Sequence, residues 1–293
     1  MNDESAPVPA PFVLVPPRVA GIPLVVASPH SGRAYPRDFL ALSRVDHMAL
    51  RHSEDFHVDE LLADAPDLGA SLIHATFPRI YCDTNREAGE LDSAMFDAPL
   101  PPGCNSTTQR VRAGLGVIPR ISATGLPLYR RRLPLAEAHA RISRFWAPYH
   151  AALSTLLDAQ VAAHGACLLV DCHSMPGIRP GIGQEAPHFV LGDVWGTSCA
   201  APITAAAEES LRAQGFRTCR NAPYAGGYIT RHYGNPAAGR HALQVEISRP
   251  LYMDESRLVR REGFAAMRTV MTTLLRAMAG VAAGLSRAPV PLP

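Results

Sequence analysis

Two histidines and one glutamate stand at or inside short apolar runs of this 293-residue sequence. His30 and His173 each closely follow such a run, and Glu246 lies within a third one. Neutral imidazoles bind zinc, and a carboxylate in an apolar setting can act as a general base. The pattern therefore predicts a metal and catalytic centre that is built around these three side chains.

The elements that must position these residues are strands of a buried sheet. Apolar runs of this length are typical of a mostly parallel sheet that is covered on both faces. The carboxyl ends of its strands meet at one edge, where the ligand sites of open α/β sheets gather. Strands are expected at 21–29, at 70–83 with a break at Pro78, at 166–171, at 188–194 and, separated by glycine turns, within 217–248.

Helical patterns alternate with these strands, so the expected fold class is α/β with a mixed sheet. Helices are expected over 45–65, 133–164, 199–215 and 255–285, the last with a break at Gly280. A Pro-rich segment, 1–20, should be irregular. Residues 21–286 should form one domain, and residues 88–130 should form an inserted loop region near or over the site.

The bulk composition points to an ordinary globular protein. The net charge is +2, which favours neither nucleic acid nor an anionic membrane as a partner. The sequence has no apolar run near the ~20 residues that span a bilayer, and its acidic start lacks the features of a signal peptide. We therefore expect a cytoplasmic protein with a small-molecule substrate. Its six cysteines form no CxxC pair and should be reduced thiols. The oligomeric state is left open.

The third metal ligand should be a carboxylate, and a stretch of acidic residues after His30 offers several. Asp55 and Asp59 are four residues apart and would share a helix face, whereas Glu54 would point elsewhere. His52 and His57 fit the helix surface or a place beside the ligands.

Glu246 has two interpretations. Burial would raise its pKa toward the range of a general base, whereas strand alternation also allows it to face water on an edge strand. Asn85 and Arg86 follow a strand and suit a carboxylate ligand, or else lie in a surface turn. The stretch 226–234 contains Tyr228, Thr230 and Arg231, and its alternative interpretation is a hairpin.

Several of these segments together resemble the N-formylglutamate amidohydrolase (N-formylglutamate deformylase) family. The segments follow the family order over about residues 20–260. They are Ser28-Pro29-His30-Ser31-Gly32, Asp55-Phe56-His57-Val58-Asp59, Asp83-Thr84-Asn85-Arg86, the run 110–118, Asp171-Cys172-His173-Ser174-Met175, Gly226-Gly227-Tyr228-Ile229-Thr230-Arg231 and Gln244-Val245-Glu246-Ile247.

The resemblance, which extends to zinc carboxypeptidases and to the succinylglutamate desuccinylase and aspartoacylase group, implies a three-layer α/β/α fold and one divalent metal, expected to be zinc. It suggests the metal ligands His30, Asp55 and His173, with Glu54 as the rival middle ligand. The acid does not lie within a few residues of His30, which is a departure from the carboxypeptidase pattern.

The resemblance also assigns roles to the other candidates. Glu246 would be the general base, and Asn85 with Arg86 would bind a substrate carboxylate. Apart from the resemblance, a cation near the metal should stabilise the oxyanion, and Arg112 or Arg231 could do so. Tyr228 and Thr230 are further candidates for substrate binding. The implied reaction is hydrolysis of N-formyl-L-glutamate to formate and L-glutamate in histidine degradation. The alternatives are a metal-dependent deacylase of another N-acyl amino acid or small peptide, and a non-catalytic metal-binding or ligand-binding relative.

Overall fold

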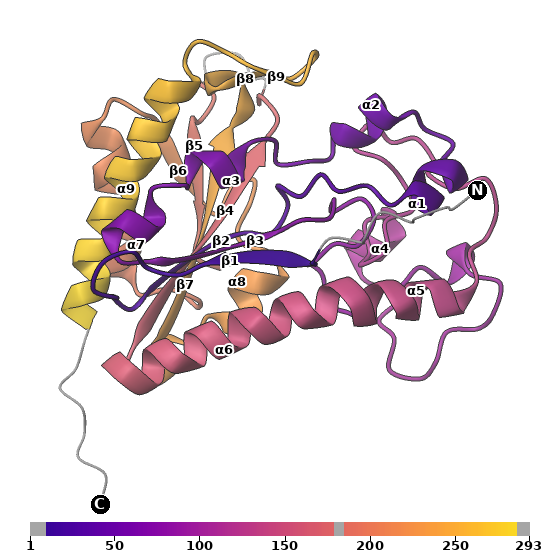
Figure 1. Ribbon diagram of the computed structural model, residues 1–293, viewed down its shortest axis with the longest axis horizontal. Coiled ribbons are helices and arrows are strands. Elements are labelled where there is room, and N and C mark those ends of the chain that lie inside the picture. Colours follow the sequence, from indigo (N-terminus) through magenta and orange to yellow (C-terminus); the bar gives the residue numbers. More distant parts are fainter. Residues whose placement is uncertain (1–9, 179–184, 286–293) are drawn as a thin grey trace, which may run out of the picture.

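A seven-stranded sheet forms the centre of the computed structural model, which describes residues 10–178 and 185–285 (Figure 1). In spatial order its strands are β1 (Phe12–Val15), β3 (Ser71–Ala75), β2 (Leu24–Ser28), β4 (Cys167–Met175), β7 (Arg240–Ser248), β5 (Phe189–Gly192) and β6 (Thr218–Arg220). The pairs β1–β3 and β5–β7 are antiparallel, and the other neighbours are parallel. The predicted fold class, α/β with a mixed, mostly parallel sheet, is confirmed.

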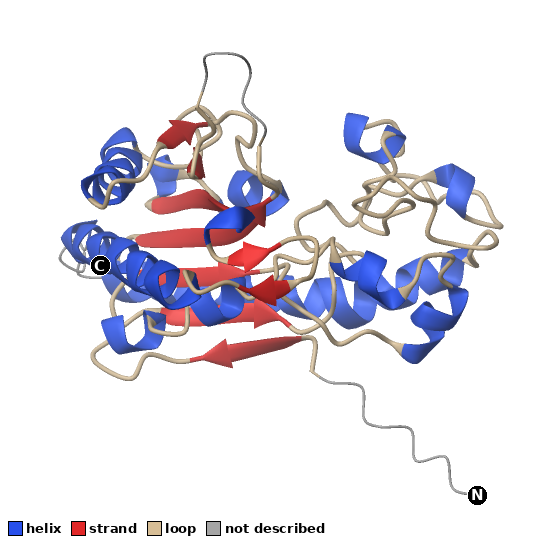
Figure 2. Cartoon of the chain, turned by 90° about the horizontal axis from the view of Figure 1, so that it is seen from above, coloured by secondary structure: helices blue, strands red, loops and turns tan. Residues whose placement is uncertain are grey.

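Helices cover both faces of this sheet. On one face lie α3 (Val58–Leu61), α7 (Ala201–Ala213) and α9 (Phe264–Leu285), and on the other lies α6 (Ala147–His164) (Figure 1). The remaining helices are α1 (Arg37–Leu42), α2 (His47–Arg51), α4 (Gln109–Arg112), α5 (Leu135–Arg141) and α8 (Tyr228–Tyr233). Many of these lie with long loops beyond one end of the strands (Figure 2). No helix of the described residues is long and apolar enough to cross a membrane.

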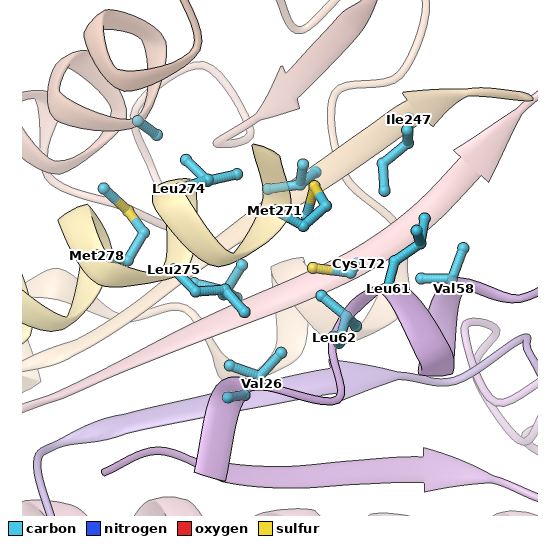
Figure 3. Close-up of a cluster of buried hydrophobic side chains, with 14 of the residues drawn as sticks. Val26, Val58, Leu61, Leu62, Cys172, Ile247, Met271, Leu274, Leu275 and Met278 are labelled. Carbon is cyan, nitrogen blue, oxygen red and sulfur yellow. The ribbon is translucent and has the colours of Figure 1, made fainter. Parts of the chain in front are cut away.

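The alternation of side chains along each strand divides the core into two clusters. In β2, Leu24 and Val26 belong to the cluster under α9, whereas Val25 and Ala27 belong to the cluster over α6. Figure 3 shows the first cluster, in which Val26 of β2 and Cys172 of β4 face Met271 and Leu275 of α9. All of these side chains are buried, so each strand contributes to two separate apolar layers.

The N-terminal segment differs from the expectation that residues 1–20 are irregular. Residues Phe12–Val15 form β1, which pairs with β3 at an edge of the sheet. Pro11 and Pro16 flank the strand without interrupting it, and prolines are tolerated beside an edge strand because no further ladder needs their N–H groups. Residues 1–9 lie outside the described part of the chain.

Two helical predictions need correction. The stretch 45–65 is divided into α2 and α3, and Asp55 lies in the turn between them, so Asp55 and Asp59 share no helix face. The last helix begins at Phe264, after the short hairpin β8 (Met253–Asp254) and β9 (Val259–Arg260), and it continues through Gly280 without a break.

The stretch 226–234 also differs from the predicted strands and from the hairpin alternative. It forms α8, which begins after Gly227. A Cβ atom on Gly227 would lie 2.2 Å from Nδ2 of Asn85, so the absence of a side chain lets Asn85 pack directly against this backbone. Gly227 therefore serves a close approach rather than a hairpin turn.

Candidate active site

The three central, mutually parallel strands β2, β4 and β7 end at the same edge of the sheet and bring the predicted residues together. His30 lies two residues beyond β2, and His173 lies near the end of β4. Glu246 of β7 is the register partner of His173. The sheet thus places both histidines and the glutamate where parallel strands were expected to place them.

Asp55 joins the two histidines in a buried group that could hold a metal ion. Its Oδ2 atom lies 2.9 Å from Nδ1 of His173 and 3.4 Å from Nδ1 of His30. The ligand atoms of the three residues all lie within 4.8 Å of one another. Two imidazole nitrogens and one carboxylate oxygen are a donor set that suits a divalent cation.

A carboxylate lies on the far side of each ring. Nε2 of His30 lies 2.7 Å from Oδ1 of Asp83, and Nε2 of His173 lies 3.1 Å from Oδ2 of Asp171. The hydrogen bond to Asp83 holds the Nε2 proton of His30 and leaves its Nδ1 atom free to bind a metal. Asp171 faces His173 as a nearby charge and not as a hydrogen-bond partner. Nδ1 of His30 is buried and has no hydrogen-bond partner among the described residues. Such orphaned atoms are rare in proteins, so a cation fits this site.

The electrostatics of the group follow from its paired charges. Burial alone would raise the pKa of Asp55, but the hydrogen bond from His173 and the nearby His30 hold that pKa well below its usual range. Burial likewise opposes ionisation of Asp83, whose pKa is nevertheless kept well below its usual range, mainly by Arg79 and His30. For His173 burial would lower the pKa, but Asp171 and Asp55 raise it well above its usual value. The charged side chains of the site therefore form a buried ion-pair network.

The rival acids lie elsewhere. Glu54 accepts hydrogen bonds from Tyr35 Oη at 2.9 Å and Arg51 Nε at 3.1 Å, which direct it away from the histidines. Asp59 lies on α3 and pairs with Arg33. Of the acids in this stretch, Asp55 is the one in the metal-binding group that the described residues form.

Glu246 is buried on an interior strand, so the interpretation of an edge strand facing water is wrong. Burial raises its pKa to about 7, and His173 opposes this shift while Asp55 adds to it. Gln244 donates a hydrogen bond of 2.9 Å to Oε1 of Glu246. The Oε1 atom of Gln244 accepts from the Gly227 N–H at 2.8 Å and from Thr230 Oγ1 at 3.3 Å. These two hydrogen bonds fix the orientation of the Gln244 amide.

A cavity of about 320 Å³ opens onto this group, a size that suits a small molecule. Apolar residues of the predicted insertion, among them Leu115, Pro119 and Ile121, form part of its wall. The polar lining includes Asp55, Asp83, His173, Glu246, Tyr224 and the arginines Arg79, Arg86 and Arg249.

Two predicted arginines are not brought to this cavity. Arg112 at the end of α4 and Arg231 on α8 are both exposed, and neither is among the residues that line the cavity. Arg79 and Arg249 lie there instead, and sequence reasoning missed both. Arg79 donates to Oδ2 of Asp83 at 2.8 Å, and its side chain is 27% exposed.

The predicted substrate-binding residues fall into two groups. Arg86 lines the cavity, whereas Asn85, Tyr228 and Thr230 do not. Asn85 is buried behind the site, with Nδ2 at 3.2 Å from Nε2 of His173 and Oδ1 accepting from the Ile229 N–H. Thr230 is fully buried against Gln244, as described above, and Tyr228 packs against Trp146 and His232.

Helix α6 and the turn before it hold the segment that carries Arg86. The Trp146 Nε1–H donates to the carbonyl of Arg86 at 2.9 Å, and His150 Nε2 lies 2.8 Å from the carbonyl oxygen of Thr84. Trp146 ends a π-helical turn, Ile142–Trp146, between α5 and α6. Such wide turns are frequent near functional sites. These hydrogen bonds hold the backbone from which the Arg86 side chain extends.

The site residues that the sequence interpretation missed carry weak signals of their own. Asp171 is two residues before His173 in an apolar strand, so alternation puts both on one face. Asp83 precedes the Asn-Arg pair, and Arg249 is three residues after Glu246. Arg79 and Tyr224 lie in irregular segments, and no periodicity marks them.

Comparison with known proteins agrees with the geometry. The profile of the family described as "N-formylglutamate amidohydrolase" matches residues 22–253. A protein named N-formylglutamate deformylase from Pseudomonas aeruginosa PAO1 is 34% identical over 265 residues, which cover 88% of this chain and 92% of that protein. Its namesake from Pseudomonas putida is 32% identical over 264 residues, with the same coverage.

A solved structure supports the same conclusion. The crystal structure of N-formylglutamate amidohydrolase from Ralstonia eutropha JMP134 matches with a TM-score of 0.88 and 38% identity, over 93% of this chain and 98% of that one. The Atu2144 gene product of Agrobacterium tumefaciens, at 16% identity and a TM-score of 0.66, shares the fold. The resemblance predicted from the sequence motifs is thus confirmed: the chain belongs to the N-formylglutamate amidohydrolase family.

Proposed function

We propose that this protein hydrolyses N-formyl-L-glutamate to formate and L-glutamate, the last step of one histidine-degradation route, with a divalent metal ion. Two observations carry the proposal. His30, Asp55 and His173 form one buried group, and Asp55, His173 and Glu246 line the same cavity. Two imidazoles and one carboxylate form a donor set typical of catalytic zinc sites, so zinc is the proposed metal. When bound, the ion would lower the pKa of water and polarise the formyl carbonyl.

Glu246 is proposed as the general base. With its pKa raised to about 7, its carboxylate can accept a proton from the attacking water near neutral pH. The protonated Glu246 then returns this proton to the leaving amine nitrogen. Gln244 occupies Oε1 of Glu246, which leaves Oε2 as the atom that moves the proton.

Arg79 takes the role that the sequence suggested for Arg112 or Arg231, that of stabilising the oxyanion. A guanidinium has five N–H donors, and Arg79 uses one of them on Asp83, the other four having no partner among the described residues. Donors that are already in place where negative charge develops stabilise the transition state without reorganisation. Asp83 thus orients both Arg79 and His30.

Arg86 is proposed to bind a carboxylate of the substrate. Its Nε and Nη1 atoms donate to the carbonyls of Leu115 and Asn85, which leaves Nη2 directed at neither carbonyl. The acyl-glutamate carries two carboxylates, which accounts for several arginines around one small cavity. Asn85 contributes by holding the backbone at Ile229 beside His173.

The experiment that tests the proposal is formate release from N-formyl-L-glutamate by purified protein. Activity should disappear after chelation and return with zinc. N-acetyl- and N-succinyl-L-glutamate serve as competing substrates, because preference for either would favour the alternative of a different N-acyl amino acid. Zinc binding without turnover of any of the three would contradict the deformylase proposal and favour a non-catalytic metal-binding protein.

A further inference from the structure

Arg249 is buried directly after β7, three residues beyond Glu246, and its guanidinium spans three segments of the site. Its Nε atom donates to Ser174 Oγ at 3.0 Å, next to His173. Its Nη1 and Nη2 atoms donate to the backbone carbonyls of His52 and Glu54 at 3.1 and 2.8 Å. Nη2 also reaches Oδ1 of Asp55 at 3.3 Å.

The two oxygens of Asp55 are thereby divided between two tasks. Oδ1 accepts from Ser174 Oγ at 3.1 Å and from Arg249, so its lone pairs are engaged. Oδ2 faces the Nδ1 atoms of His173 and His30. The Asp55 N–H also donates to the carbonyl of His30 at 3.0 Å, which fixes the backbone. The carboxylate therefore has one orientation in the site.

We propose that Arg249 is a positioning residue for the metal site. Its hydrogen bond engages Oδ1 of Asp55, so that Asp55 would bind the metal through Oδ2 alone. This inference rests on the proposed metal-dependent function. A carboxylate can bind a cation through one oxygen or two, and the number decides how many coordination positions remain open. Partners that hold a ligand in this way raise metal affinity and set the geometry.

Arg249 also lines the cavity, so a role in substrate binding is the competing interpretation. Its hydrogen bonds argue against this. Four of its five N–H donors are used on Ser174, Asp55 and two backbone carbonyls, which leaves one for a ligand. A bidentate pair with a substrate carboxylate takes two donors in a fork, and Arg249 has only one left. The two interpretations differ in what they predict for metal affinity.

The test measures zinc affinity of metal-free protein by competition with a chromophoric chelator. Arg249→Lys keeps the positive charge but loses the planar guanidinium and most of its hydrogen bonds. We expect it to weaken zinc binding by about 10- to 100-fold. Ser174→Ala removes the other donor to Oδ1 and should weaken binding in the same direction. With cobalt(II) in place of zinc, the visible absorption of both variants should lose intensity as Asp55 binds through both oxygens. Substrate KM at saturating zinc should stay within about threefold of wild type.

Controls distinguish this inference from general damage to the fold and from failure of the proposed function. Arg220 lies on the far strand β6 and pairs with Glu208 of α7, so Arg220→Lys should leave zinc affinity unchanged. If Arg249→Lys does not fold by circular dichroism, Ser174→Ala carries the test. Wild-type zinc affinity and cobalt spectrum in both variants, or a raised KM alone, would overturn the inference. Failure of the wild-type protein to bind zinc would instead contradict the proposed function itself.

Discussion

The two faces of the central strands β4 and β7 differ toward the carboxyl ends of these strands, although alternate residues of the same strands form them. On the α9 face Cys172 and Val245 are part of an apolar cluster. On the opposite face Asp171, His173 and Glu246 are equally buried but are polar or charged. One face therefore contributes burial of apolar area along the strands. The other is apolar only at their beginning, where Leu169 and Ala242 lie, and toward their ends it contains groups whose desolvation is unfavourable.

The difference teaches how a buried strand can support chemistry. A side-chain period of two lets the apolar face anchor the strand while the other face holds charges at fixed positions. The stability of the fold and the activity of the site should then respond to changes on different faces. Each of the following predictions tests that separation, beginning with the largest expected effect.

Replacing Glu246 by Gln should reduce kcat by about 10²- to 10⁴-fold, because the general base is lost. The metal-free variant should be at least as stable as wild type at pH 8. The folded-state pKa of Glu246 is raised to about 7, so above that pH the buried carboxylate is charged and destabilises the fold, and a neutral amide removes this penalty. Steady-state formate release and urea unfolding measure the two effects. A variant that loses stability together with activity would contradict the separation.

Replacing Arg79 by Met should lower kcat by about 10²- to 10³-fold, as expected for loss of a cation that stabilises the oxyanion. Arg112→Met and Arg231→Met are matched controls, since both arginines are exposed and away from the cavity lining. If Arg112→Met or Arg231→Met had the larger effect, the assignment to Arg79 would be wrong. Zinc content of each variant shows whether loss of metal explains a change in rate.

Replacing Leu275 by Ala should lower the free energy of unfolding by about 2–5 kcal/mol, because a cavity opens in the fully buried cluster under α9. At 25 °C kcat and zinc affinity should remain close to wild type. Leu275→Met, which keeps the volume, should cost less than about 1.5 kcal/mol. A large fall in kcat of the folded Leu275→Ala protein would mean that the two faces are coupled.

His150 should give the stability of the site face a dependence on pH. Burial lowers its folded-state pKa from 6.5 to about 4, so its contribution to stability is complete above pH 6.5 and is lost as the pH falls toward 4. Relative to His150→Gln, wild type should lose up to about 3 kcal/mol between pH 7 and pH 4. Urea unfolding of both proteins across this range measures the difference. Parallel curves would show that His150 titrates normally.

The sequence predicts the strand-borne part of the site well. His30, His173 and Glu246 are found where parallel strands end, because contiguous apolar runs mark those strands directly. Asp55 was predicted for a wrong reason, since it lies in a turn and not on a helix face. Its place is set by contacts with residues more than a hundred positions away, such as His173.

The sequence does not show which arginines lie at the active site, because the long side chain of an arginine can place its guanidinium far from its own backbone. Arg231 follows a glycine pair that suggested a flexible hairpin, yet α8 turns it to the surface. Arg249 lies just after a predicted strand, but its partners at positions 52–55 become neighbours only in the folded chain. Edge strand β1 was missed because prolines around it conceal the short apolar run.

The position of β7 has a consequence for how the protein folds. β7 is the last strand of the large sheet in the chain but lies inside it, between β4 and β5. Until it is synthesised, β1 to β4 and the pair β5–β6 have no strand to join them. Contacts such as that of Arg249 with Asp55, 194 residues apart, close a very long loop and form late. A growing chain on the ribosome therefore lacks the finished site until its final quarter emerges, and a cation captured by the two histidines and Asp55 alone would be held without Glu246 or Arg249.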